Sequence, residues 1–342
     1  MKAAAILHIA PEQTEVREIR LAAVKPDEVL IQAICSAISA GTEGMIYRGH
    51  VPSGMTADAT IASLSGALEY PFRYGYALAG TVIEAGRKVD PKWLGQKVFV
   101  FHPHQERLVV PVQDCFAIPH DLSVEDALFL PNMESALNFV QDANPPFGAW
   151  VMVFGLGVVG LLTSLLLARL PLSWLIAAEP LAYRRQTALE CGLQSVIDPC
   201  DPSQWNHLLS QLFDGQGSHG VDIAIELSGN MEALNQAIEV TGFSGTIVAG
   251  SWYGTQSQGL DLGKHFHRRR IAIVSSQVST VNPRLSGRWT KQRRIDLTWR
   301  MIRELRPAFL ISHRFSPTDC DRAFQLASLA SDNCHQIIFE YS

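Results

Sequence analysis

The stretch Trp150–Ala168, WVMVFGLGVVGLLTSLLLA, constrains the possible folds of this chain most strongly, because it contains no charged residue. As one helix it would be long enough to cross a bilayer. It also contains the sequence GLGVVG, which begins at Gly155 directly after the apolar run VMVF and opens the helical run VVGLLTSLLLARL. A glycine-rich turn between a strand and a helix is typical of a nucleotide-binding fold, and we favour this interpretation over a membrane helix.

Each glycine of this motif has a physical purpose. Gly155 permits a tight turn, Gly157 lets the backbone approach a pyrophosphate, and Gly160 lets the helix pack closely on the strand. The amides of Val158 and Val159 would lie at the helix N-terminus, where free N–H groups and the positive end of the helix dipole favour phosphate. We therefore predict dinucleotide binding; the remaining alternative is a glycine-rich turn without a ligand.

A second signal follows about 20 residues later, at the spacing expected for such a fold. The next apolar run, LIAAE, ends in Glu179, whose carboxylate can accept hydrogen bonds from ribose hydroxyls. Because this carboxylate would repel a 2′-phosphate, NAD is favoured and NADP remains possible. Arg184 and Arg185 could approach such a phosphate, but we interpret them as the solvated face of the following helix.

Composition limits the remaining function classes. The chain has 342 residues, of which 47% are hydrophobic and 18% charged, with a net charge of −5. This length suits two domains, and the mild acidity argues against nucleic-acid binding. The basic run HFHRRR is short, and we interpret it as a solvated loop or a contact to an anionic group. We expect neither a nucleic-acid partner nor a membrane anchor.

Cysteine usage and the N-terminus indicate the compartment. The six cysteines are scattered without a CxxC pair, which is typical of free thiols in a reducing compartment. The N-terminal sequence MKAAAILHIAPEQTE turns polar too early for a secretory signal and is better interpreted as a first strand. We expect a cytoplasmic protein.

Two regions differ in their rhythm of elements. Residues 1–124 are rich in short strands such as EVLIQAICSAIS and RLVVPV, punctuated by Gly and Pro, which predicts an antiparallel, barrel-like domain. In 125–304, strands such as VDIAIE alternate with helical segments, which predicts a parallel sheet covered by helices. After the amphipathic helix KQRRIDLTWRMIREL, residues 305–342 add one more helix and one more strand, and we expect them to complete the first domain.

Several motifs together resemble the medium-chain dehydrogenase/reductase superfamily, which includes alcohol dehydrogenases and quinone reductases. The segments DEVLIQAICSAISAGTEGMIYRG, YPFRYGYALAGTVIEAG, FGLGVVGLL and VDIAIELSGNMEALNQAI carry the resemblance across nearly the whole chain. It implies an α/β protein with a GroES-like β-barrel catalytic domain and a Rossmann domain, a doubly wound parallel sheet. It also implies a nicotinamide cofactor, a small-molecule substrate and a homodimer.

The chain departs from the family at the positions that hold catalytic zinc. The family's cysteine position falls at Ser39 or Ala40, its Gly-His-Glu is replaced by GYA with Tyr76 at the histidine position, and the third ligand region carries Pro131 or Asn132. Zinc requires thiolate, imidazole or carboxylate donors, so we predict no zinc. The family's four-cysteine structural zinc lobe is replaced by FVFHPHQERLVV.

Without a metal, hydrogen-bond donors or a general acid must stabilise or protonate the substrate oxygen. Thr42 occupies the family's proton-relay position, with a loop-capping hydroxyl as the alternative. Tyr76 could donate from its phenol or merely fill the metal pocket. Ser39 could be a weaker donor, and Glu43 a catalytic group or a loop anchor.

Two histidines and one further carboxylate complete the catalytic candidates. His102 or His104 could supply the proton, and at i and i+2 of an extended segment they could point the same way toward a metal, with Glu106 as a third donor. We favour polar loop residues over a metal site. Glu134, on the helix entering the second domain, is better interpreted as a capping or paired carboxylate.

On the cofactor side, the candidates follow three strands of the predicted parallel sheet, because ligands of such sheets bind beyond the strands' carboxyl ends. We expect contacts to cofactor or substrate from the segments SG, SWY and SSQ, with these residues: Ser228, Gly229, Ser251, Trp252, Tyr253 and Ser276.

The sequence thus predicts a zinc-independent NAD(P)-dependent oxidoreductase that interconverts alcohol and carbonyl. Two alternatives remain open: reduction of a quinone or enone, and a catalytically silent NAD(P)-binding redox sensor. The substrate itself is not encoded in any motif.

Overall fold

A computed structural model of the chain describes residues 1–52, 54, 56, 61–64, 66–214, 219–256, 258–329 and 333–341. The chain forms two compact units: a terminal unit, Met1–Pro131 with Trp299–Ser342, and a central unit, Asn132–Thr298. The domain boundaries predicted at 124/125 and 304/305 fall inside helices α2 (Val124–Ala127) and α8 (Lys291–Leu305). The structure divides the chain instead within α3 (Leu130–Ala143) and within α8.

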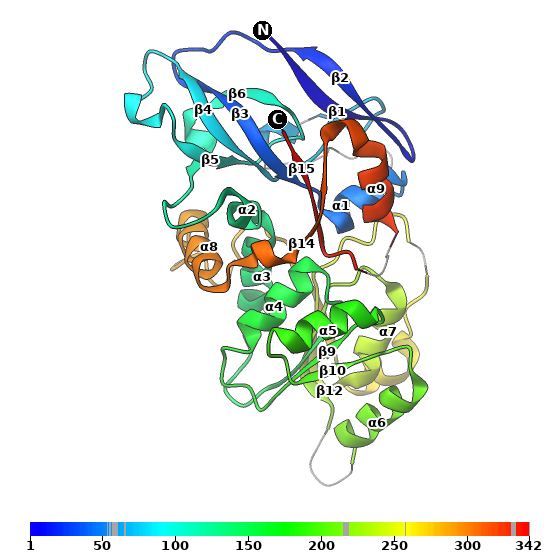
Figure 1. The fold of residues 1–342 in the computed structure, drawn as a ribbon. Helices are drawn as coiled ribbons and strands as arrows, with labels where there is room; N and C mark the ends of the chain where they lie inside the picture. The colour runs from blue at the N-terminus through cyan, green and yellow to red at the C-terminus, as the bar shows by residue number, and fades with distance from the viewer. Residues whose placement is uncertain are drawn as a thin grey trace. The chain divides into compact units, whose positions relative to one another are not determined.

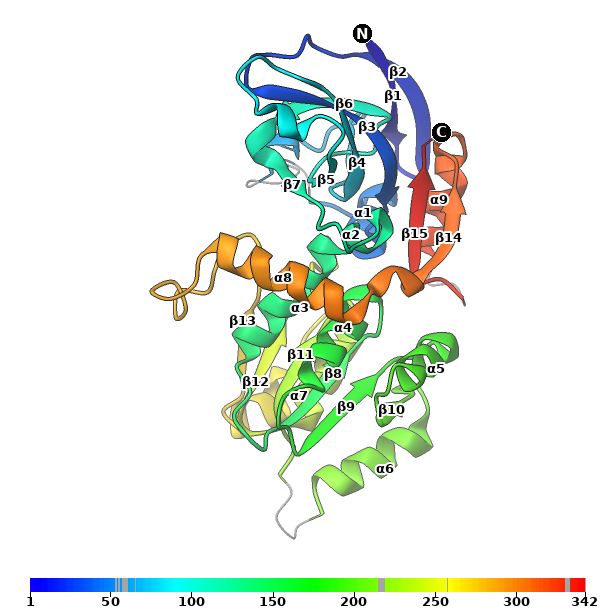
Figure 2. The same cartoon turned by 60° about the vertical axis from the view of Figure 1, so that its left-hand side comes forward.

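The central unit is built on a six-stranded parallel sheet with the order β10-β9-β8-β11-β12-β13 (Figure 2). The chain starts in the middle of the sheet, builds outward to one edge, returns and builds outward to the other. This order is that of a doubly wound dinucleotide-binding fold, as predicted. The strands are β8 (Trp150–Phe154), β9 (Trp174–Ala178), β10 (Ser195–Ile197), β11 (Val221–Glu226), β12 (Thr241–Ala249) and β13 (Ala272–Ser275).

Helices connect these strands. They are α4 (Val158–Leu167), α5 (Ala182–Glu190), α6 (Pro202–Leu212) and α7 (Met231–Val240), with the π-helical turn η4 (Leu262–Phe266) before β13. The two runs predicted as helices from their period, YRRQTALECGL and MEALNQAIEVTG, form α5 and α7. The inner strands β8, β9 and β11 are largely buried because helices cover them, and Met152, Phe154 and Ile176 belong to one core cluster.

The uncharged stretch is not a single helix. Trp150–Phe154 is strand β8 and Val158–Leu167 is helix α4, separated by the glycine-rich turn. Across the part of the chain that the structure describes, no helix is both long and apolar enough to span a membrane. The interpretation as a membrane helix is therefore wrong for this stretch.

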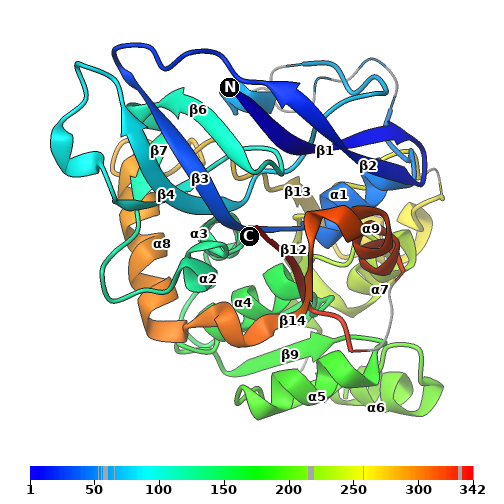
Figure 3. The same cartoon turned by 45° about the horizontal axis from the view of Figure 1, so that its top comes forward.

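The terminal unit contains a seven-stranded sheet with the order β14-β15-β3-β4-β5-β7, in which β6 also pairs with β3 (Figure 2). It also contains a separate β1–β2 hairpin (Figure 3). The tail strand β15 runs antiparallel to β3 and parallel to β14. The strands are β1 (Lys2–Ala10), β2 (Gln13–Arg20), β3 (Glu28–Ala37), β4 (Leu78–Ala85), β5 (Lys97–Val100), β6 (Arg107–Pro111), β7 (Cys115–Ala117), β14 (Ile311–Phe315) and β15 (Gln336–Glu340).

Helix α1 (Ala40–Tyr47) follows β3 where the sequence suggested a loop. It lies beside α9 (Cys320–Ser328) (Figure 1). The Arg48 guanidinium, just after α1, donates to the Ser328 carbonyl oxygen at 2.8 Å. An isolated helix of this length would not be stable in water. Burial of Ile46 and Tyr47 in the core of the terminal unit stabilises α1. Single 3₁₀ turns complete the unit: η1 (Ala62–Leu64), η2 (Pro91–Trp93), η3 (Val112–Asp114), η5 (Pro307–Leu310) and η6 (Pro317–Asp319).

His8, in β1, is a buried imidazole of the terminal unit's core. Its side chain lies between the rings of Phe72 and Phe324, with centroids at 5.4 and 4.9 Å. Neither ring nitrogen has a hydrogen-bond partner within the described part of the chain. Burial, and then the neighbouring charge of His104, lower the pKa of His8 from 6.5 to about 3.

We expect the stability of the terminal unit to fall with acidification. In the unfolded chain His8 takes up a proton near pH 6.5, whereas in the folded chain it does so only near pH 3. Between these two pH values the unfolded state therefore binds more protons than the folded state. The contribution of His8 to the unfolding free energy is complete above pH 6.5 and is lost progressively as the pH falls toward 3. His8→Leu should reduce the pH dependence of the unfolding free energy between pH 4 and 5.5 by up to about 1.4 kcal/mol per pH unit, measured by urea titration.

The matched control for this prediction is His50→Gln at an exposed position, which should leave the dependence unchanged. An unaltered pH slope in His8→Leu would contradict the assignment.

Candidate functional site

The turn between β8 and α4 is fixed by two close backbone approaches. Gly155 has φ +90°, and a Cβ on it would lie 2.8 Å from the Ser228 main chain. A Cβ on Gly160 would lie 1.8 Å from the Gly155 carbonyl oxygen, so the helix can pack against the strand only with glycine there. Both positions are glycine for structural reasons, as the motif predicts.

Gly157 differs from its two partners. It is the N-cap of α4, with φ −60° and ψ 179°, and has no capping side chain. A Cβ on it would meet only the Arg184 guanidinium nitrogen, at 3.8 Å. Space therefore remains over Gly157, beside the amides of Val158 and Val159, which have no intrahelical acceptor. This is the arrangement that holds a pyrophosphate.

Glu179 comes directly after β9 and is 2% exposed. One carboxylate oxygen accepts from the Leu156 amide at 2.7 Å and the other from the Leu181 amide at 3.0 Å. Glu179 thus ties the glycine-rich turn to the end of the neighbouring strand, and each oxygen keeps a lone pair for another donor. The sequence predicted only the second of these properties.

The two arginines after Glu179 do not form a solvated helix face, and that interpretation is wrong. The Arg184 guanidinium lies 3.8 Å from Glu179 Oε2, and its side chain is 20% exposed. Arg185 donates to the Glu179 carbonyl oxygen at 2.8 Å and pairs with Asp198 at 3.1 Å. Helical period could not reveal these partners, because they lie before and after the helix in the sequence.

Glu226, at the end of β11, organises the next two loops and was missed by sequence reasoning. This fully buried carboxylate accepts hydrogen bonds from the Ser228 amide at 2.6 Å, the Ser228 hydroxyl, the Gly229 amide at 3.1 Å and the Tyr253 hydroxyl. Burial and the Glu226 charge raise the pKa of the Tyr253 phenol. The Ser251 hydroxyl accepts from the Gly229 amide at 2.8 Å.

The contacts around Glu226 bring four predicted cofactor residues together: Ser228, Gly229, Ser251 and Tyr253. In the sequence, the role of Glu226 could have been recognised from its place as the carboxylate that ends the apolar strand VDIAIE.

Ser276 is 7% exposed, and its hydroxyl donates to Asp142 and accepts from the Asn138 amide group at 2.8 Å. The Ser276 side chain therefore links the segment after β13 to helix α3 through hydrogen bonds. It does not lie on an open surface where it could contact a nicotinamide. A hydroxyl flanked by two polar groups of a distant helix cannot be recognised from the local sequence.

Glu134 also belongs to a scaffold. Its carboxylate pairs with the buried guanidinium of Arg294 at 3.0 Å and with Lys291 at 2.7 Å. It is a paired carboxylate, as the sequence indicated, and both partners lie on α8.

In the terminal unit, two of the predicted donors meet. The Tyr76 hydroxyl donates to Ser39 Oγ across a very short hydrogen bond. Ser39 is the N-cap of α1 but uses its hydroxyl for no cap. Thr42 lies in the first turn of the same helix and is half-buried. The structure thus joins Tyr76 and Ser39 directly and places Thr42 one helical turn further on.

His102 makes its hydrogen bond to a different partner from Tyr76 and Ser39. Its Nδ1–H donates to the Pro103 carbonyl oxygen at 2.9 Å, and burial lowers its pKa to about 4. Near neutral pH it is therefore uncharged, which does not suit a proton donor. His104, in contrast, contacts the Glu43 carboxylate at 2.8 Å.

His102, His104 and Glu106 do not converge on a metal. The Glu106 carboxylate accepts from the Ala4 amide at 3.2 Å, while the two rings bond elsewhere. In the described ranges, no three His, Cys, Asp or Glu side chains are grouped so that they could hold a metal ion. The same part of the chain contains no disulfide, and all six cysteines are free thiols.

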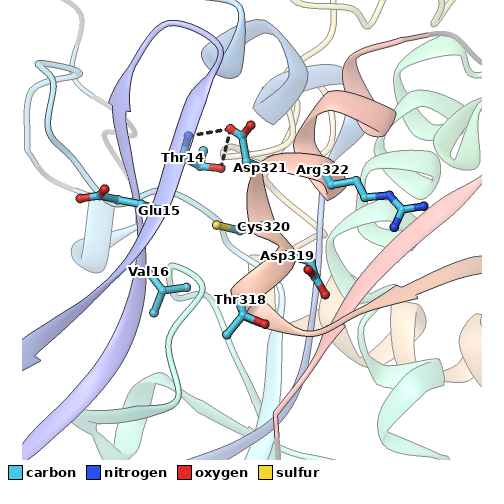
Figure 4. Close-up of a pocket in the computed structure, with 8 residues that line it drawn as sticks. All are labelled: Thr14, Glu15, Val16, Thr318, Asp319, Cys320, Asp321 and Arg322. Carbon is cyan, nitrogen blue, oxygen red and sulfur yellow. Dashed lines mark hydrogen bonds between the residues drawn. The ribbon is translucent and has the colours of Figure 1, made fainter.

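A surface cavity of about 410 Å³ lies between β2 and the start of α9 (Figure 4). One of its carboxylates, Asp321, already accepts at Oδ1 from the Thr14 amide at 2.9 Å, from the Thr14 hydroxyl and from Tyr47. None of the residues predicted to be functional lines the cavity. It is not the candidate site.

The fold and the glycine-rich turn define a two-unit, dinucleotide-binding dehydrogenase architecture, and comparison with known proteins agrees. Residues 159–291 match the family model described as zinc-binding dehydrogenase, a range that excludes Ser39 and Tyr76. The chain is 27% identical over 235 residues to D-guloside 3-dehydrogenase of Escherichia coli strain K12, covering 68% of this chain and 66% of that protein. It is 28% identical over 239 residues to (R,R)-butanediol dehydrogenase of Bacillus subtilis strain 168, covering 62% and 65%.

A solved structure extends the likeness to the full length. An alcohol dehydrogenase of Escherichia coli CFT073, crystallised with NADH, shares the fold with a TM-score of 0.76 over 99% of both chains at 18% identity. In these stretches of sequence and in its fold, the chain is similar to proteins of the medium-chain dehydrogenase/reductase superfamily, the likeness that its motifs indicate.

A matched pair of variants tests the turn. Gly157→Ala adds a methyl group into open space, so it should cost less than about 1 kcal/mol of stability, yet it should weaken NADH binding at least about tenfold by obstructing the pyrophosphate. Gly160→Ala should instead destabilise the fold, because its methyl overlaps a carbonyl oxygen. Urea unfolding and calorimetric NADH titration separate the two effects; native affinity in Gly157→Ala would argue against this turn as the binding site.

Proposed function

We propose that this protein is a zinc-independent NAD(P)-dependent oxidoreductase that transfers hydride between nicotinamide and an alcohol or carbonyl substrate. The named dehydrogenase relatives and the family-model match support the dehydrogenase activity. The single observation that carries the zinc-independent mechanism is the Tyr76–Ser39 hydrogen bond: Tyr76 stands at the family's histidine position, and Ser39 is one of the two residues, with Ala40, at its cysteine position.

The donor set at these positions does not fit zinc. A phenol and a hydroxyl bonded to each other replace the imidazole and thiolate donors that zinc prefers. The third ligand region offers Pro131 and Asn132, neither of which supplies such a donor. We therefore assign no step to a metal.

The residues around the glycine-rich turn do fit a nicotinamide dinucleotide. The amides of Val158, Val159 and Gly160 at the start of α4 would hold the pyrophosphate, beside the open space at Gly157. The remaining lone pairs of Glu179 would accept the ribose hydroxyls, which favours NAD. The loops that Glu226 organises, with Ser228 and Tyr253, would line the other end of the cofactor.

In this proposal, bound NADH supplies a hydride, and the protein supplies the proton and the electrostatic stabilisation. As a carbonyl is reduced, negative charge develops on its oxygen. The Tyr76 O–H, which now donates to Ser39 Oγ, would turn to that oxygen and give up its proton. The Ser39 O–H would then donate a hydrogen bond to the resulting phenolate, and solvent water would return the proton to Tyr76. Thr42, one turn along α1, is a second hydroxyl donor in the proposal.

The substrate is a small molecule carrying a secondary alcohol or the corresponding ketone. The two named relatives support this, since their names specify a sugar derivative and a diol. A panel of 2,3-butanediol with acetoin, xylitol with xylulose, an enone and a quinone, each with both cofactors, separates this proposal from its rivals. Turnover only of the enone or quinone would favour a reductase, and cofactor binding without any turnover would favour a redox sensor.

Cofactor preference should depend on Glu179. If its carboxylate accepts the ribose hydroxyls, NADH should bind at least about tenfold more tightly than NADPH, because a 2′-phosphate would be repelled. Glu179→Ala should narrow this difference, with a loss of stability from the Leu156 and Leu181 amides it now satisfies. Fluorescence titration with both cofactors measures the ratio, and equal affinities in the parent protein would refute the assignment.

Tyr76→Phe should lower kcat by about 10²-fold or more while leaving the Kd for NADH unchanged, because it removes only the donating hydroxyl. The measurement uses the panel substrate 2,3-butanediol or acetoin and a parallel NADH titration. Thr42→Val is the companion variant for the second hydroxyl. Unchanged turnover in either variant would remove that residue from the mechanism.

A homodimer formed through β13 is part of the proposal. This strand is at the edge of the central sheet, and its Val274 is 38% exposed. An exposed edge with an apolar side chain can pair with a second copy. Light scattering should give twice the monomer mass for the parent protein and a smaller mass for Val274→Lys; a monomeric parent would exclude the dimer.

The free thiols support a cytoplasmic location.

A further inference from the structure

A chain of buried polar groups lies behind Ser39 in the terminal unit, and the proposed mechanism does not use it. At its centre the side chains of Glu43 and His104 are both fully buried, with His104 Nε2 2.8 Å from Glu43 Oε2. Removing such groups from water is costly unless every polar atom finds a partner. The pattern of their partners therefore shows what the pair holds in place.

On one side, the chain ends at the last strand. His104 Nδ1 is 2.8 Å from Ser36 Oγ, which is 2.9 Å from the Tyr341 hydroxyl. Burial raises the pKa of Tyr341, so its phenol remains protonated and shares one hydrogen bond with the Ser36 hydroxyl. Because a carboxylate oxygen accepts, His104 Nε2–H donates to Glu43 Oε2, while Nδ1 shares the other hydrogen bond with Ser36 Oγ.

On the other side, the chain ends at Ser39. Glu43 Oε1 accepts from the Ser39 amide at 2.8 Å, and the Ser39 carbonyl oxygen accepts from the Glu43 amide at 2.8 Å. This is the carboxylate half of a capping box, displaced by one residue. Because Glu43 holds the main chain of Ser39, the Ser39 hydroxyl stays available for Tyr76.

His104 also contacts the backbone that precedes Tyr76. Gly75 has φ +122°, and a Cβ on it would lie 2.8 Å from both Cδ2 and Nε2 of the His104 ring. The ring therefore lies directly against Gly75, and only a glycine accommodates it. Through Glu43 and through Gly75, His104 contacts the segments that carry both members of the donor pair.

We propose that Glu43 and His104 are positioning residues that hold Ser39 and Tyr76 in hydrogen bond with each other. The link from Glu43 to Ser39 runs through an amide N–H, which does not shuttle protons, so the pair sets geometry and does not relay a proton. The inference rests on the proposed function, because it names what prepares the donor pair for that reaction.

The test follows the Tyr76 phenol directly. The full chain carrying tyrosine labelled with ¹³C at Cζ gives one resonance per tyrosine, and loss of a signal in Tyr76→Phe assigns the Tyr76 resonance. Glu43→Gln and His104→Gln should each move this resonance by more than its line width, because Ser39 is no longer held. Glu43→Asp, which keeps the charge, should restore part of the shift.

The matched control is Asp126→Asn. Asp126 is also a buried carboxylate of the terminal unit, and it accepts a hydrogen bond from the hydroxyl of Ser123, the N-cap of α2. It should lower the unfolding midpoint but leave the Tyr76 resonance in place. If Glu43→Gln or His104→Gln lowers the midpoint while the Tyr76 resonance stays at its parent position, the pair is merely structural and the proposal is wrong.

The readout needs no substrate, so its failure is distinct from failure of the proposed function. If either glutamine variant does not fold, Glu43→Asp alone decides, because shortening the side chain by one methylene group should move the resonance in the same direction by a smaller amount. An unmoved resonance in a folded Glu43→Asp would overturn the proposal in that case.

Discussion

The contact between the Gly155 carbonyl oxygen and the Cα of Gly160 is the constraint on which the central unit depends. It packs β8, the turn and α4 closely against one another. The first amides of α4 then lie beside the open space over Gly157. Because β8 lies in the middle of the sheet, the order of all other strands is built outward from it. A single steric condition thus positions both the scaffold and the cofactor-binding surface.

In the terminal unit, the corresponding constraint is the one that holds the hydroxyl groups of Tyr76 and Ser39 in place. By the motif resemblance, two metal-ligand positions of the superfamily fall at Tyr76 and at Ser39 or Ala40, and here the hydroxyl groups of Tyr76 and Ser39 are hydrogen-bonded to each other. A metal would fix its ligands by coordination, whereas hydroxyl groups rotate and must be fixed by their surroundings. Burial of Glu43 and His104 beneath them supplies such surroundings, because buried polar groups tolerate only the geometry that satisfies every donor and acceptor.

Likeness to a superfamily leaves the chemistry to particular residues. The named relatives share about a quarter of the aligned residues, and the range matched by the family model lies within the central unit. The glycine-rich turn is common to this architecture, whereas the hydroxyl pair and the Glu226 contacts are properties of individual side chains. The named dehydrogenase relatives support the oxidoreductase class, and these side chains carry the proposal of how the protein works.

The sequence by itself determined the alternation of strands and helices, the glycine-rich turn, Glu179 at the end of β9 and the helix Lys291–Leu305, because each depends on local period or on backbone space. Only the tertiary structure decided helix α1, the partners of Arg185, the scaffold role of Ser276, and the Glu43–His104 pair. These depend on groups far apart in the chain: Ser36 and Tyr341 are separated by 305 positions, and Ser276 and Asp142 by 134. No local pattern records such distances, since it is the packing of the sheet and helices that brings these side chains together.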